Sequence, residues 1–154
     1  MKCVVCGHAE LIQSIANLDF NGVALVEGVR YECPECGEQY DGFERVEALS
    51  RAVAHHIARR VERLTPAEIR FLRKYLGYSG KDFAAFLGVA PETVSRWESS
   101  ASNKAMTLST EKLLRYMALN EKPISDYGLE MAGTSTEESA PPTFFNREGV
   151  WVAA

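Results

Sequence analysis

The stretch from Ser79 to Glu98 reads SGKDFAAFLGVAPETVSRWE. Ser79 is a preferred N-cap residue, and Gly88 is the residue type that most often ends a helix in the left-handed conformation. Pro91 suits the first position of a new helix, where its missing N–H leaves no hydrogen bond unmade. Ala84 is small, which allows two helices to cross closely at that point. The stretch therefore predicts two short helices joined by a tight turn.

The second of these helices is expected to bury two side chains and to expose the others. Val94 and Trp97 lie about one turn apart and form its apolar side. Their spacing from Gly88 is that of a helix-turn-helix, and residues 88–98 resemble the xenobiotic-response-element (Cro/repressor-like) family. The resemblance implies that this helix lies in the major groove of DNA. An ordinary helical packing domain is the alternative. The residues left for the outer surface are Pro91, Glu92, Thr93, Ser95 and Arg96.

The outer surface of this helix supplies the candidates for DNA recognition. Arg96 is the best of them, because a guanidinium can bind guanine O6 and N7 together. Glu92, one turn earlier, either accepts a hydrogen bond from cytosine N4 or orients Arg96. Residues 51–104 carry ten basic and five acidic side chains, which favours a polyanionic partner. The side chains expected to contact phosphates, which position a protein without reading sequence, are Lys81, Thr93, Ser95, Asn103 and Lys104.

Two flanking helices complete the expected DNA-binding domain of residues 65–119. Thr65-Pro66-Ala67-Glu68 has the form of a capping box with proline at the first helical position. A last helix is predicted over residues 108–119, with Ser109 or Thr110 as its cap.

All four cysteines fall into two C-x2-C pairs, Cys3 with Cys6 and Cys33 with Cys36. Two intervening residues let a tight turn direct both sulfurs at one ion, and the glycine after each pair can adopt a positive φ. Four thiolates suit a tetrahedral Zn²⁺ with a closed, structural shell. Disulfides or free thiols are one alternative. Iron is another, because rubredoxins also use two such knuckles and this sequence is similar to them there; the protein would then carry electrons.

Residues 1–42 are expected to form a small zinc-ribbon-like β domain around these cysteines. Short strands are predicted at residues 11–15, 23–26 and 29–32, with a hairpin turn at Asn21-Gly22 and a second turn at Gly28. A segment of this size buries too little apolar surface to be stable through burial alone. We therefore expect the metal to supply much of its folding free energy.

The segment between the two halves has a helical periodicity. Apolar residues recur at spacings of three and four from Phe43 to Leu64, which predicts a connecting amphipathic helix over residues 43–64. Asp41-Gly42 is expected to end the ribbon and cap this helix. The predicted class is thus α+β, with a zinc-ribbon-like β domain followed by an all-α Cro/repressor-like helix-turn-helix domain.

A CxxCG…CxxCG ribbon followed by such a helix-turn-helix is similar to the YgiT-type zinc finger/helix-turn-helix family, which includes the MqsA antitoxins, over about residues 1–119. The resemblance implies Zn²⁺ at the four cysteines and DNA reading at Glu92 and Arg96. It also implies a homodimer that binds a palindromic operator of double-stranded DNA, as an autorepressing transcriptional regulator. The alternative role is an antitoxin that neutralises a toxin ribonuclease through residues 1–42. Residues 1–50, with three basic and nine acidic side chains, suit a basic protein partner.

Composition excludes several classes of protein. Hydrophobic residues make up 46% and charged residues 25% of the chain, which is typical of a globular protein and not of a disordered one. No apolar run reaches the length of about 18 residues that a membrane span needs, and no signal-peptide core is found, so we expect a cytoplasmic protein. No serine–histidine–aspartate or paired-carboxylate pattern with useful spacing is found, so we expect no enzyme.

Residues 120–154 are the least informative part of the chain. Residues 130–142 are polar and are expected to form a flexible linker. Two apolar segments, Phe144-Phe145 and Val150-Trp151-Val152, flank a turn-like Asn146-Arg147-Glu148-Gly149. They predict a small docking hairpin, or a strand added to a sheet edge of this chain or of a second copy, with disorder as the alternative.

Overall fold

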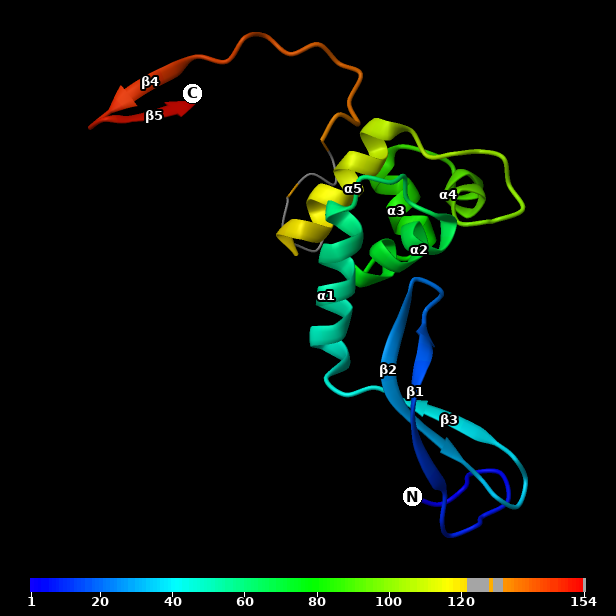
Figure 1. The fold of residues 1–154 in the computed structure, drawn as a ribbon. Coiled ribbons are helices and arrows are strands. Elements are labelled where there is room, and N and C mark those ends of the chain that lie inside the picture. The colour runs from blue at the N-terminus through cyan, green and yellow to red at the C-terminus, as the bar shows by residue number, and fades with distance from the viewer. Residues whose placement is uncertain (122–127, 129–131, 154) are drawn as a thin grey trace.

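The computed structural model describes residues 1–121, 128 and 132–153, which form an α+β fold (Figure 1). The N-terminal sheet has the strand order β1 (Ile12–Phe20), β2 (Ala24–Glu32) and β3 (Gln39–Gly42). The helices are α1 (Val46–Arg59), α2 (Pro66–Tyr75), α3 (Gly80–Leu87), α4 (Pro91–Trp97) and α5 (Leu108–Asn120). A separate antiparallel pair follows, β4 (Phe144–Arg147) with β5 (Val150–Ala153).

The ribbon is a longer hairpin than the sequence predicts. β1 and β2 pair along their full length around the expected Asn21-Gly22 turn, where both residues have positive φ (56° and 72°). The predicted turn at Gly28 is wrong, because β2 continues through this residue, opposite Ala16. A Cβ at Gly28 would lie 2.8 Å from Leu18 Cδ1 and from a backbone oxygen of β3. Glycine is needed here for close packing. The third strand, β3, was not expected.

α1 occupies only part of the segment predicted to be helical. It covers 14 residues within residues 43–64. Its N-cap is Arg45, which has a left-handed backbone and no side-chain cap, whereas the expected cap, Asp41-Gly42, ends β3. Val61, expected on the apolar side, is 97% exposed. The apolar periodicity therefore continues beyond the helix at both ends.

The predicted helix starts of the C-terminal half are confirmed at two positions. Thr65 and Glu68 form the expected capping box of α2. The Ser79 hydroxyl accepts a hydrogen bond from the Asp82 N–H at the start of α3, and Gly88 ends that helix with φ 67°. The cap of α5 is Thr107 and not Ser109 or Thr110, because the Thr107 hydroxyl accepts from the Thr110 N–H.

One apolar core joins the tip of the ribbon to the helices. Phe20, at the end of β1, contacts Phe71 of α2 and Phe43 edge-on, with ring centroids 6.0 Å and 5.3 Å away. Residues of all five helices lie in the same cluster. The opposite end of the ribbon, with the N-terminus, extends away from the helices (Figure 1). None of the described helices has the length and apolar composition needed to cross a membrane.

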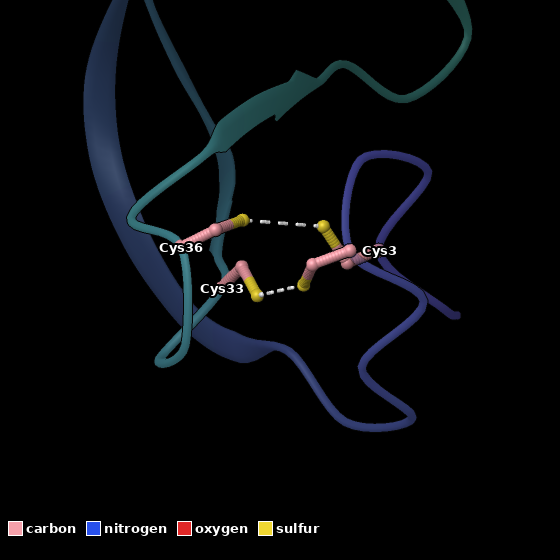
Figure 2. A group of neighbouring side chains, drawn as sticks. Cys3, Cys33 and Cys36 are labelled. Carbon is pink, nitrogen blue, oxygen red and sulfur yellow. Dashed lines mark hydrogen bonds between the residues drawn. The ribbon is translucent and has the colours of Figure 1, made fainter.

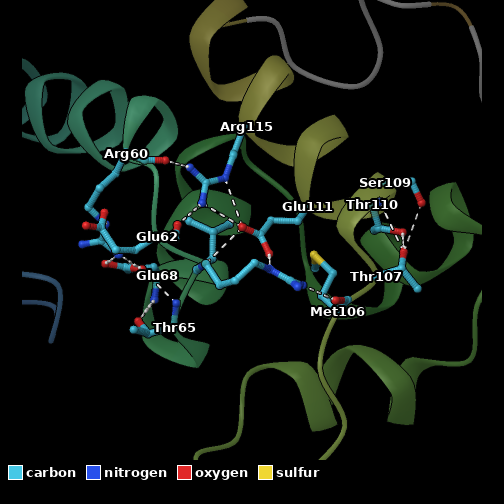
Figure 3. A network of polar contacts seen from close by, with 12 residues as sticks. Arg60, Glu62, Thr65, Glu68, Met106, Thr107, Ser109, Thr110, Glu111 and Arg115 are labelled. Carbon is cyan, nitrogen blue, oxygen red and sulfur yellow. Dashed lines mark hydrogen bonds and ion pairs between the residues drawn. The ribbon is translucent and has the colours of Figure 1, made fainter.

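A buried carboxylate connects the ends of α1 and α5 (Figure 3). Glu111 is 2% exposed and accepts hydrogen bonds from Arg63, Arg115 and the Leu64 N–H. Arg115 also donates to the carbonyl groups of Ile57 and Ala58 at the C-terminal end of α1. Two parts of the chain that are distant in sequence, residues 57–64 and α5, are thereby held together.

The C-terminal segment forms the hairpin that the sequence predicts. Phe145 pairs with Val152 and Asn146 with Trp151, around a turn in which Glu148 and Gly149 have positive φ. All eight strand residues are exposed. Residues 130 and 131 of the expected linker lie outside the described residues.

We expect Glu111→Gln to lower the free energy of unfolding by about 3 kcal/mol at neutral pH, because it leaves two arginines without their carboxylate. Burial raises the pKa of Glu111, but hydrogen bonds from Arg63, Arg115 and the Leu64 N–H outweigh burial and hold it below the ordinary 4.5. The carboxylate therefore stabilises the fold above pH 4.5 and loses this contribution as the pH falls through the folded pKa. Urea unfolding, monitored by circular dichroism at several pH values, should show this acid-induced loss of stability in the parent. The Glu111→Gln variant should not show it.

The control for this experiment is Glu62→Gln, which removes a carboxylate that is 70% exposed and, among the described residues, is paired with Arg60 alone. It should change the stability by less than about 1 kcal/mol. An acid-induced loss of stability that is the same in Glu111→Gln and in the parent would contradict the prediction.

Candidate functional site

The four cysteine sulfurs converge on one point at the free end of the ribbon (Figure 2). All four lie within 4.8 Å of one another, and the Sγ–Sγ distances are 3.6 Å for Cys3–Cys36 and 3.5 Å for Cys6–Cys33. A tetrahedral shell with metal–sulfur bonds of about 2.3 Å has sulfur–sulfur edges of about 3.8 Å. The arrangement therefore fits a four-coordinate metal ion, and zinc is compatible with it.

Both knuckles have the same backbone hydrogen bonds. The Gly7 N–H donates to the Cys3 carbonyl at 3.0 Å, and the Gly37 N–H donates to the Cys33 carbonyl at 2.9 Å. Both glycines have positive φ, 77° and 74°, as the sequence predicts. The carbonyl group of His8, five positions after Cys3, accepts a hydrogen bond from the Cys3 N–H. The repeated turn explains why two cysteines with two residues between them direct both sulfurs to the same side of their knuckle.

Tyr40 of β3 is a neighbour of the cysteines that the sequence did not reveal. Its hydroxyl lies 3.4 Å from Cys3 Sγ and accepts from the Val4 N–H at 3.2 Å. This hydroxyl, followed by the Cys6 backbone N–H, lowers the pKa of Cys3 to about 6. The Cys3 contact and burial raise the pKa of Tyr40 to about 12. A backbone hydrogen bond from Glu38 lowers the pKa of Cys36, but burial and the neighbouring thiols raise it to about 12 overall. The surroundings of Cys3 and Cys36 thus move the pKa values of these two thiols in opposite directions.

The structure places the side chains of α4 as the spacing predicts. Val94 and Trp97 are buried, with 1% and 5% exposure. Glu92, Ser95 and Arg96 are exposed, and Thr93, the remaining candidate on this helix, is half-buried. In the part of the chain that the structure describes, no hydrogen bond or ion pair joins Glu92 to Arg96. Both side chains are therefore available to a ligand.

The other candidates lie outside α4. Lys81 is in the first turn of α3 and is exposed. Asn103 and Lys104 are exposed residues of the loop between α4 and α5. They line a pocket of about 250 Å³ together with Trp97. This loop is therefore next to the C-terminal end of α4.

A buried ion pair that the sequence did not reveal fixes the end of α4. Arg73 of α2 donates to both carboxylate oxygens of Glu98, the residue after α4, and its Nη1 donates to the Tyr78 carbonyl at 2.7 Å. Both side chains are less than one-tenth exposed. Arg70 adds longer contacts to the Glu98 carboxylate (3.4 Å) and carbonyl (3.3 Å). Because a buried bidentate pair has little freedom, the orientation of α4 relative to α2 is fixed.

The outer surface of the ribbon combines exposed apolar side chains with acidic residues. The large apolar side chains exposed there are Val4, Val5, Ile12, Ile15 and Leu25. A ribbon of this charge and composition is suited to binding another protein.

Comparison with known protein families finds one match, over residues 1–123, to the family described as the antitoxin component of the bacterial toxin–antitoxin system, MqsA. No curated protein and no solved structure matches the chain. The matched residues contain the ribbon with its four cysteines and all five helices, and they end before the β4–β5 hairpin. The chain therefore belongs to the MqsA family of antitoxins.

Proposed function

We propose that the protein is a sequence-specific DNA-binding regulator that represses its own promoter and has a structural zinc domain. The observation that carries this proposal is the burial of Val94 and Trp97, which leaves Glu92 and Arg96 on the free side of α4. The proposed role is binding without catalysis. The proposed domains are the ribbon of residues 1–42, the connecting segment 43–64, the DNA-binding domain 65–119 and the tail 120–154.

In this proposal α4 enters the major groove and reads bases with two side chains. Arg96 donates two hydrogen bonds to guanine O6 and N7, and Glu92 accepts one from cytosine N4. The Arg73–Glu98 pair positions the helix without contacting DNA. Contacts to phosphates, which set the register of the protein on the duplex, are assigned to Lys81, Thr93, Ser95, Asn103 and Lys104.

The proposed DNA-binding form is a homodimer. α5 exposes three large apolar side chains, Leu108, Leu113 and Tyr116, with exposures of 51%, 39% and 60%. Exposed apolar side chains on a helix whose other face lies in the core support an interface with a second copy. A two-fold dimer would place two copies of α4 against the half-sites of a palindromic operator.

Zinc is the metal we assign to Cys3, Cys6, Cys33 and Cys36. The donor set is four sulfurs with no open position, which is typical of structural zinc. When bound, the ion links the knuckle before β1 to the knuckle after β2. The ribbon has little apolar core at this end, so this link holds its two chain segments together.

A second candidate function is neutralisation of a toxin ribonuclease through residues 1–42. It is favoured by the exposed apolar side chains of the ribbon together with its acidic charge. Complementary charge accelerates association, and the apolar side chains supply the buried area. The toxin surface and α4 lie on different parts of the chain, so one molecule can carry both functions.

We expect Arg96→Ala to weaken binding to the protein's own promoter by about 1–3 kcal/mol, because the bidentate guanine contact is lost. Arg59→Ala removes an exposed arginine from α1 and is the matched control; it should leave the affinity nearly unchanged. Affinity would be measured by fluorescence anisotropy at several salt concentrations. If Arg96→Ala binds the promoter as tightly as the parent, the assignment of α4 as the recognition helix is wrong.

Removal of the metal should reduce the strand signal of the circular dichroism spectrum and leave most of the helical signal. The ribbon loses its link between the knuckles, whereas the helices retain their own core. Metal analysis before and after chelation gives the identity and amount of the bound metal. A red ferric protein would indicate iron in place of colourless zinc. A spectrum that does not change after verified loss of metal would defeat the structural role.

We expect Ile15→Glu combined with Leu25→Glu to weaken binding to the toxin at least about tenfold, since each places a charge in an apolar contact. The binding partner in this test is the proposed toxin ribonuclease, and its affinity is measured by calorimetry. Val61→Glu changes an even more exposed apolar residue outside the ribbon and is the control. If the double variant binds the toxin as tightly as the parent, this face of the ribbon is not the toxin-binding surface. The promoter affinity of the double variant and of Val61→Glu should remain that of the parent.

A further inference from the structure

A pocket lies between the tip of the ribbon and the helices. Its volume is about 410 Å³, which is within the range of about 300–1,000 Å³ that small-molecule sites occupy. Asn21 of the β1–β2 turn and Ser50 of α1 form one part of its lining, and α2 forms the rest. Pockets between structural units are frequent ligand sites, because groups from several elements converge there.

The charge of the lining favours an anion. Arg70 and Lys74 are exposed and lie four residues apart on α2, so both side chains are on one side of the helix. No aspartate or glutamate is among the described residues that line the pocket. Lys74 has no ion pair within the described part of the chain, and Arg70 has only the long contacts to Glu98. An unpaired lysine beside an arginine whose ion pair is long, 3.4 Å to Glu98, is suited to a carboxylate or phosphate group.

An aromatic wall adjoins these cations. The rings of Phe71 and Tyr75 are stacked, with centroids 6.4 Å apart and an interplanar angle of 12°. Both residues line the pocket. The Asn21 amide and the Ser50 hydroxyl make no side-chain hydrogen bonds to other described residues. Phe71 is only 8% exposed and Tyr75 is half-buried, so Tyr75 supplies most of the apolar surface that a ligand could contact beside the polar groups.

We propose that this pocket binds a small anionic effector, a molecule with one carboxylate or phosphate group and a planar apolar body. Arg70 and Lys74 bind the anionic group, and the planar body lies against the Phe71–Tyr75 wall. Asn21 and Ser50 are available for hydrogen bonds to the remaining polar atoms. Since the lining comes from the ribbon turn, α1 and α2, a bound effector would contact all three elements.

The position of Arg70 connects this pocket to α4. Arg70 reaches the Glu98 carboxylate and carbonyl at 3.4 Å and 3.3 Å, whereas Arg73 holds the same carboxylate by shorter contacts. An anion in the pocket competes with Glu98 for Arg70 and removes a contact from the C-terminal end of α4. The effector should therefore lower the affinity for operator DNA, and by linkage DNA should lower the affinity for the effector by the same factor. This consequence rests on the proposed DNA binding, whereas occupancy of the pocket does not.

The test uses the full-length protein labelled with ¹⁵N and four probes: phenyl phosphate, benzoate, inorganic phosphate and phenol. We expect phenyl phosphate or benzoate to shift the amide resonances around Asn21, Ser50 and Lys74 in a saturable way at millimolar concentrations. Comparison of these two distinguishes phosphate from carboxylate recognition. Inorganic phosphate and phenol should each bind more weakly, because each lacks one half of the proposed ligand.

Arg70→Gln and Lys74→Gln should each weaken probe binding by about tenfold, the expected effect of losing a charge-assisted hydrogen bond. Arg59→Gln, another exposed arginine, is the matched control and should bind as the parent does. Absence of a saturable shift with both aromatic anions, or binding by both pocket variants as tight as that of the parent, would overturn the site. If phenol binds as tightly as phenyl phosphate, the proposed role of the cations is wrong. If inorganic phosphate binds as tightly as phenyl phosphate, the proposed role of the aromatic wall is wrong.

A separate measurement tests the connection to α4. The probe that binds best is added to the protein–promoter complex, and the decrease in promoter affinity is compared between the parent and Lys74→Gln. A decrease in promoter affinity that is smaller in Lys74→Gln than in the parent supports the connection between the pocket and α4. If a saturating concentration of the probe leaves the promoter affinity of the parent unchanged, this connection is wrong. If the protein does not bind its promoter at all, the proposed DNA function fails while the resonance shifts still decide whether the pocket binds an anion.

Discussion

The packing of Phe20 against Phe71 is the contact on which the arrangement of the two halves depends. It brings the tip of a two-stranded ribbon into the core of the helices, although the other end of the ribbon has almost no apolar interior. The ribbon is thus held at both ends by different forces, apolar burial at the tip and converging thiols at the cysteine end. The tip needs this burial, because β3 pairs only with the other end of β2 and a two-stranded hairpin alone is marginally stable in water.

The recognition surface depends in the same way on contacts behind it. α4 has only seven residues, and its N-cap Ala90 makes no side-chain hydrogen bond, so the helix has little stability of its own. Burial of Val94 and Trp97 sets its rotation about its axis, and the Arg73–Glu98 pair fixes its C-terminal end. The direction in which Arg96 points is therefore determined by residues on the other side of α4 from the surface proposed to bind DNA.

Local features of the fold were predictable from the sequence, and long-range ones were not. The caps at Thr65 and Ser79 and the positive φ of Gly88 depend on a few neighbouring residues, so a short stretch is sufficient to identify them. The two cysteine knuckles were predictable because their spacing alone restricts the geometry. The turn predicted at Gly28 was wrong, since glycine serves there to let β3 and Leu18 approach, which no neighbour in sequence indicates.

The same distinction applies to the candidate site. Tyr40 reaches Cys3 across 37 positions, and Arg73 reaches Glu98 across 25. A charged residue on the apolar side of a predicted helix, as Arg73 is on α2, is the one signal in the sequence that a buried partner exists. It does not identify the partner. The end of α1 was misplaced for a related reason, because its apolar period continues into residues that the fold leaves exposed, such as Val61.

The charge distribution explains how one short chain can present separate surfaces to different partners. The ribbon is acidic and the helical half is basic, so a nucleic acid is repelled from the first and attracted to the second. The two halves meet at the ribbon tip, where α2 supplies Arg70 and Lys74 beside the Phe20–Phe71 contact. The proposed ligand would contact the junction itself, where Arg70 lines the pocket and also touches the end of α4. In the proposed function, control of DNA binding through this junction requires only the exchange of one weak arginine contact for another, with no rearrangement of the core.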